Sequence, residues 1–312
     1  MNILKGRALK KILGTVVVLI VIVLFTNTLT RNWDNVQQLD ITLGIHSVIA
    51  TVFFFLAVVF SGYLWGRVFE RISGKRVGYR EAVRSHSAAW LLKYVPGQVG
   101  AFVYKLQWAK GEGIGKKDAT VAFAYETLFL TLASTVIIIP VLLISVGDRT
   151  DSSLLVIYVL GLMAFLFLSG KFMNTLIGKF IRKITGMEVA KKYILSLKGM
   201  SIFTAWFSIS RLLNAIGFVV LAASILPVTP GMYVPLGAAY VFAGIVGMYA
   251  IMVPSGLGVR EAVVAVFAST YFPPEQAIVA ALLARLYATV ADGLVALLYV
   301  YLTRSNNKKV AS

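Results

Sequence analysis

Long, uninterrupted apolar runs dominate the hydrophobic pattern of the chain. A helix that crosses a bilayer needs about 20 mostly apolar residues, because hydrocarbon offers its backbone amides no partner outside the helix. The pattern predicts spans at 12–29, 45–68, 119–146, 153–170, 200–226, 233–253 and 277–303. A shorter apolar piece, 262–272, would cross only if its helix began near Gly258. We therefore predict an all-α integral membrane protein, a polytopic helical bundle of about six to eight spans, in a single domain over 1–312.

A proline and a glycine interrupt the apolar stretch 83–108. Each half has about nine to eleven residues, or about 14–16 Å as a helix, which is half of a bilayer. Pro96 removes an amide donor and disfavours helix at the residue before it, and Gly97 permits a turn. We predict a helix, a break and a second helix that re-enter the membrane from the cytoplasmic side. A surface helix lying on the headgroups is the alternative.

A second break has similar lettering in the other half of the chain. Residues 253–258 (VPSGLG) share the pattern V-P-small-x-apolar-G with residues 95–100 (VPGQVG). Broken hydrophobic segments at corresponding places in two halves point to the central binding site of a transporter. We predict broken segments near 83–108 and 233–272, and the match suggests an internal repeat.

Composition and charge support the membrane class. Hydrophobic residues make up 59% of the 312 residues and charged residues 14%, which excludes an ordinary soluble domain, and the absence of cysteine excludes a disulfide scaffold. The net charge of +17 is expected to face anionic lipid headgroups and not nucleic acid. Alternate connections carry four, eleven, seven and three basic residues against one, one and none. This bias predicts a multi-pass protein of the cell (plasma or inner) membrane with both termini cytoplasmic, its first span a retained anchor.

Four ionisable residues fall inside predicted spans: Glu126, Arg211, Arg285 and Asp292. Each costs about 2.5–3.5 kcal/mol at a helix centre, so they should face the bundle interior and find partners. We expect the arginines to receive the phosphate of a lipid headgroup, because guanidinium matches phosphate with two parallel hydrogen bonds. The carboxylates would keep the cations charged or receive a cationic headgroup. In the alternative, Arg211–Glu126 or Arg285–Asp292 are structural ion pairs.

The second break also has the features of an anion site. Free backbone amides are expected where a helix opens after Gly258, and Glu261 near that end favours the helix dipole. Arg260 opposes the dipole and needs another reason for its place there, such as an anionic partner. The predicted substrate-binding residues are Lys93, Pro96, Gly97, Gly100, Arg211, Ser255, Gly256, Gly258, Arg260 and Arg285. The predicted charge-pairing residues are Glu126, Glu261 and Asp292.

Other polar and aromatic residues suggest no further chemistry. His46 and His86 lie 40 residues apart without a carboxylate pair beside them, so we expect no metal, no cofactor and no catalytic residue. The rings near the first break are expected to be anchors at the membrane interface: Trp90, Tyr94, Tyr104 and Trp108.

The motifs KYVPGQVG and PSGLGVREA give the chain a family resemblance. From the first span to the last, it resembles the flippase-like membrane domain of the lysylphosphatidylglycerol synthase (multiple peptide resistance factor) family. The resemblance implies movement of a lipid or lipid-linked headgroup between leaflets. In bifunctional relatives a soluble domain makes the aminoacyl lipid, and we expect here a stand-alone membrane domain without it.

Three functions are compatible with these features. We expect a transporter of a phospholipid or lipid-linked headgroup, driven by a gradient or by mass action, since the chain has no P-loop for ATP. A non-catalytic partner of a separate synthase or glycosyltransferase is the first alternative, and a homodimer is compatible with either. A membrane-embedded transferase is the second alternative, although the chain has neither clustered carboxylates nor a D-x-D motif.

Overall fold

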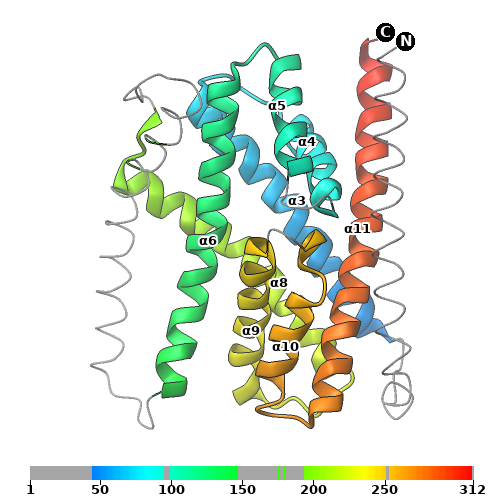
Figure 1. The fold of residues 1–312 in the computed structure, drawn as a ribbon. Helices are drawn as coiled ribbons and strands as arrows, with labels where there is room; N and C mark the ends of the chain where they lie inside the picture. The colour runs from blue at the N-terminus through cyan, green and yellow to red at the C-terminus, as the bar shows by residue number, and fades with distance from the viewer. Residues whose placement is uncertain are drawn as a thin grey trace.

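The computed structural model describes residues 44–94, 99–146, 193–250 and 253–310, together with Thr175 and Lys179. Within these ranges the regular structure is entirely helical, as the hydrophobic pattern predicts (Figure 1). The predicted spans at 12–29 and 153–170 lie outside the described residues.

Five long helices form the frame of the bundle. Within the described ranges, these five are long and apolar enough to cross a membrane, which confirms a multi-pass membrane protein. The five are α3 (Ile45–Ser73), α6 (Lys116–Val146), α8 (Leu197–Ala223), α9 (Pro230–Tyr249) and α11 (Pro274–Val310). They begin and end within a few residues of the predicted spans, except that α3 and α11 extend further at their C-terminal ends.

The first predicted break separates two short helices that pack against each other. Helix α4 (Tyr79–Leu91) continues into the 3₁₀ turn η1 (Leu92–Tyr94), and α5 (Val99–Gly111) follows. We call this unit the first hairpin. Its two α-helices have 13 residues each, about 20 Å, so neither is long enough to cross a bilayer alone. Pro96 and Gly97 lie outside the described residues.

The second predicted break forms a comparable unit. Helix α9 is followed by the 3₁₀ turn η4 (Pro254–Gly256) and by α10 (Val259–Ala268), which packs back on α9. We call this unit the second hairpin. Helix α10 has ten residues, about 15 Å, and this length excludes the alternative in which 258–272 crosses the membrane by itself.

Left-handed backbone makes the second turn possible. Ser255 (φ 54°), Gly256 (φ 64°) and Gly258 (φ 78°) all have positive φ, a region that side chains with a Cβ rarely adopt. Gly256 also lies directly against Gly247 of α9, because a Cβ at position 256 would come within 2.6 Å of the Gly247 Cα. The reversal of the chain here depends on two glycines meeting backbone to backbone.

The two hairpins approach each other from opposite ends of the bundle. In Figure 1 the first hairpin lies above and the second below, and the two face each other near the middle. The turns η1 and η4 are in contact. Large buried side chains hold the surrounding helices: Trp65, Phe69 and Trp108 pack together around the first hairpin, and Phe218 stacks on Tyr240 beside the second.

Candidate functional site

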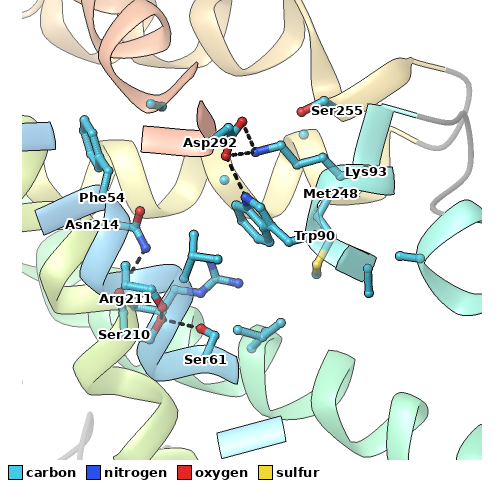
Figure 2. Close-up of a pocket in the computed structure, with 18 of the residues that line it drawn as sticks. Phe54, Ser61, Trp90, Lys93, Ser210, Arg211, Asn214, Met248, Ser255 and Asp292 are labelled. Carbon is cyan, nitrogen blue, oxygen red and sulfur yellow. Dashed lines mark hydrogen bonds and ion pairs between the residues drawn. The ribbon is translucent and has the colours of Figure 1, made fainter. Parts of the chain in front are cut away.

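A cavity of about 170 Å³ lies between the two breaks. Side chains from every α-helix that the structure describes, and from both 3₁₀ turns, line it. Sites for drug-sized ligands typically occupy about 300–1,000 Å³, so this cavity suits a small polar group and not a whole lipid. In Figure 2, Lys93, Trp90 and Asp292 lie on one side, and Arg211, Ser210 and Ser61 on the other.

Asp292 of α11 accepts hydrogen bonds from three residues of the first hairpin. The Trp90 indole nitrogen lies 2.7 Å from Oδ1, and the Tyr94 hydroxyl lies 2.7 Å from Oδ2. The Lys93 ammonium lies 2.7 Å from Oδ2 and completes the set (Figure 2). Asp292 itself is 6% exposed. Four polar side chains therefore satisfy one another inside the protein, and they join the tip of the first hairpin to α11.

These contacts correct the expectation that the aromatic rings are interfacial anchors. Trp90 and Tyr94 bind Asp292, and Trp108 is buried and donates to Glu81 Oε1 at 2.6 Å. Tyr104 is half-buried against the core. Trp90, Tyr94 and Trp108 each place a polar donor beside a carboxylate, a use of these rings that suits the protein interior as well as an interface.

Glu126 of α6 is paired with two residues that the sequence did not suggest as partners. Its carboxylate contacts the Lys105 ammonium, and the other oxygen lies 3.2 Å from Nδ1 of His86. Lys105 also lies over the Trp65 ring, 3.9 Å from its centroid. All three ionisable side chains are almost completely buried. The alternative in which Arg211 pairs with Glu126 is therefore wrong.

Arg285 of α11 contacts residues of the second hairpin and does not pair with Asp292. Its guanidinium lies 3.6 Å from Glu261 Oε1 and donates to the Ser255 hydroxyl at 3.1 Å. The alternative Arg285–Asp292 pair is wrong, because the two side chains lie two helical turns apart and reach different hairpins. Glu261 occupies the first turn of α10, as expected, and faces a cation there.

Two arginines that line the cavity have no ion-pair partner within the described ranges. Arg211 of α8 has a buried Nε without any hydrogen-bond partner. Arg260 of α10 lies over the Tyr240 ring, 5.5 Å from its centroid. A buried charge without a counterion costs several kcal/mol, so this side of the cavity favours an anionic occupant. Asn214 and Ser210 add polar groups on the turns next to Arg211 (Figure 2).

The remaining predicted residues divide by position. Ser255 lines the cavity, whereas Gly256 and Gly258 shape the turn beside it, and Gly100 in α5 does not line it. Sequence reasoning missed Lys105 and His86 as members of the site. A lysine in the apolar run FVYKLQW and a histidine among small residues, SHSAA, were the available signals. Within the described ranges no three His, Asp or Glu side chains gather as a metal site would require.

A comparison of the sequence with known protein families agrees with this architecture. No curated protein matches the chain significantly. The sequence model described as "Lysylphosphatidylglycerol synthase TM region" matches residues 11–296, which is nearly the whole chain. Within the described ranges, five helices long and apolar enough to span a membrane and the two hairpins accompany this match. The chain is thus a member of the lysylphosphatidylglycerol synthase transmembrane-region family.

Proposed function

We propose that the chain is a transporter that moves a phosphate-bearing lipid or lipid-linked headgroup between leaflets without covalent chemistry. One observation carries the proposal: among the residues that the structure describes, Arg211 and Arg260 face the cavity without an ion-pair partner, while the other cations around it are paired. Lys93, Lys105 and Arg285 all have a carboxylate partner. The cavity therefore offers two positive charges to an anion that enters it.

The chemistry of the two arginines favours a phosphate. A guanidinium presents parallel N–H groups that match two phosphate oxygens, and charge-assisted bonds of this kind are about twice as strong as neutral ones. The cavity volume of about 170 Å³ suits a headgroup alone. The acyl chains would stay in the bilayer while the headgroup passes through the protein.

The hairpins support movement between leaflets. We infer that the first hairpin and α10 re-enter the membrane and that the tips of the two hairpins meet at membrane depth, because α4, α5 and α10 are too short to cross. Non-helical backbone at that depth is tolerated where it lines a polar cavity. Transporters commonly bind substrate at such breaks and expose it alternately to the two sides. Membership of a lipid-related family supports a lipid as the substrate.

Reconstitution tests the proposal. The purified chain is placed in liposomes containing phosphatidylglycerol labelled on one acyl chain, and quenching of the label by an added reductant reports its movement between leaflets. We expect Arg211→Ala and Arg260→Ala each to lower the rate about 10- to 100-fold, because each removes a charge-assisted contact of about 1.5–3 kcal/mol. Arg80→Ala, at an exposed arginine at the start of α4, should leave the rate unchanged.

Three results would overturn the proposal. Normal transport by the folded double variant would show that the arginines do not hold the headgroup. An inactive wild-type chain that becomes active only beside a separate synthase would instead support the non-catalytic partner, and transfer of a group to the lipid by the purified chain would support an enzyme.

A further inference from the structure

One buried basic nitrogen beside the cavity has no partner. His86 is 5% exposed, it lines the cavity, and its Nε2 has no hydrogen-bond partner within the described ranges. Its other nitrogen, Nδ1, lies 3.2 Å from Glu126 Oε1. The ring is therefore fixed on one side and unsatisfied on the other.

The contacts of Nδ1 assign the proton of the neutral ring. An ionised carboxylate can only accept, so Nδ1 carries the hydrogen and donates it to Glu126. The Lys105 ammonium lies 3.5 Å from the same nitrogen, at the limit of a hydrogen bond, and is already in close contact with Glu126. Nε2 is then left with a free lone pair, which is a base without a donor.

Burial and the neighbouring Lys105 ammonium outweigh the one carboxylate at His86, so the ring is neutral unless a further anion comes near it. Glu126 from α6 favours the imidazolium, whereas Lys105 from α5 and burial oppose it. Gly62 of α3 packs against the Cβ of His86 and is uncharged. Trp90, stacked 6.3 Å from the ring, separates it from Asp292 of α11 and Lys93 of η1, which neutralise each other. An additional anion in the cavity would therefore decide the charge of the ring.

We propose that His86 Nε2 is a proton-binding site coupled to the binding of the anionic headgroup in the same cavity. The inference rests on the proposed function. A proton from water binds the Nε2 lone pair as the anion binds Arg211 and Arg260, and it returns to water when the anion leaves. By linkage, each ligand raises the affinity for the other by the same factor. The chain would carry a proton together with a singly charged phosphodiester, so a pH gradient would drive transport away from the acidic side.

The sequence offers a clean first experiment, since it contains only two histidines. His46 is exposed in the first turn of α3 and serves as the reference. Full-length chain labelled on histidine and placed in lipid nanodiscs should give two imidazole NMR signals, which His46→Gln and His86→Gln assign. We expect the His86 signal to show a neutral ring between pH 5 and 8 without ligand, and its titration midpoint to move up into this range with glycerophosphoglycerol, a phosphodiester that does not itself titrate there. The shift should vanish in the Arg211→Ala, Arg260→Ala double variant.

A His86 signal that is the same with and without the phosphodiester across this pH range overturns the proton site. This readout needs no transport, so it is independent of the proposed function. A coupled titration in a chain that moves no lipid would instead overturn the transport proposal and support the proton site as part of an anion-binding site.

A pH gradient across the liposomes supplies the second experiment. With the acidic solution on the side of the labelled lipid, we expect wild-type transport to rise at least about fivefold, the lower end of common coupling factors. In His86→Gln the ratio of rates with and without the gradient should fall to one, and His86→Asn should behave alike. His46→Gln should keep the wild-type ratio. An unchanged ratio in both His86 variants overturns the coupling.

Discussion

The two hairpins meet at the same place but are held there by different forces. The first is attached through side chains, since Trp90, Lys93 and Tyr94 all bind Asp292. The second is closed through its backbone, where Gly256 lies against Gly247 with no room for a Cβ. Polar contacts can be exchanged for a ligand or for water, whereas a steric fit cannot. The second hairpin is therefore the fixed wall of the cavity, and the first hairpin is the releasable wall.

The hairpins also differ in the charges they bring. Lys93 and Lys105 of the first hairpin are paired with carboxylates. Arg260 of the second faces the cavity without a counterion in the described part of the chain. The positive charge of the fixed wall is therefore available to a ligand. The positive charges of the releasable wall are already neutralised by carboxylates of the protein.

The largest expected loss of stability follows from removing the attachment of the first hairpin. Asp292→Ala leaves the Lys93 ammonium and two further donors without an acceptor, which should cost about 3–5 kcal/mol of unfolding free energy. Denaturant unfolding of the detergent-solubilised chain measures it. Glu275→Ala, at an exposed carboxylate on the same helix, should change stability by less than about 0.5 kcal/mol. Equal effects of the two substitutions would refute the role given to Asp292.

A methyl group at the second turn should have a somewhat smaller effect. Gly256→Ala combines left-handed backbone, about 1–2 kcal/mol for a residue with a Cβ, with overlap against Gly247, about 1–3 kcal/mol. We expect a total of about 3 kcal/mol in the same unfolding measurement. Gly244→Ala on α9 is the matched control, because a Cβ there meets no atom within 4 Å. A tolerated Gly256→Ala would show that the second hairpin is not sterically fixed.

The smallest expected loss of stability comes from removing one hydrogen bond of the attachment and leaving the others in place. Tyr94→Phe removes a single hydrogen bond to Asp292, while Trp90 and Lys93 remain bound. We expect a loss of about 1–2 kcal/mol. Tyr79→Phe, at an exposed tyrosine at the start of α4, should be close to neutral. If Tyr94→Phe were as damaging as Asp292→Ala, the attachment would depend on the tyrosine alone.

Much of the fold was predictable because local signals determine it. Apolar runs long enough to cross a bilayer predicted α3, α6, α8, α9 and α11, and a proline followed within two residues by a glycine predicted both breaks. These features follow from backbone hydrogen bonding and sterics, which act within a few residues.

The pairing of charges could not be predicted in the same way. Glu126 could have met Arg211, but α4 and α5 bring His86 and Lys105 to it first. Which partner a buried carboxylate finds depends on how distant helices pack. That packing depends in turn on details such as Gly62 and Gly66, which admit α4 to the surface of α3.

Helix α11 reaches both hairpins from one face. Arg285 binds Ser255 and Glu261 of the second hairpin, and two turns further along Asp292 binds the first. A shift of α11 along its axis by a single turn would break both sets of contacts together. A displacement of this one helix would therefore be felt at the same time at the tip of the first hairpin and at the Arg285 contacts of the second.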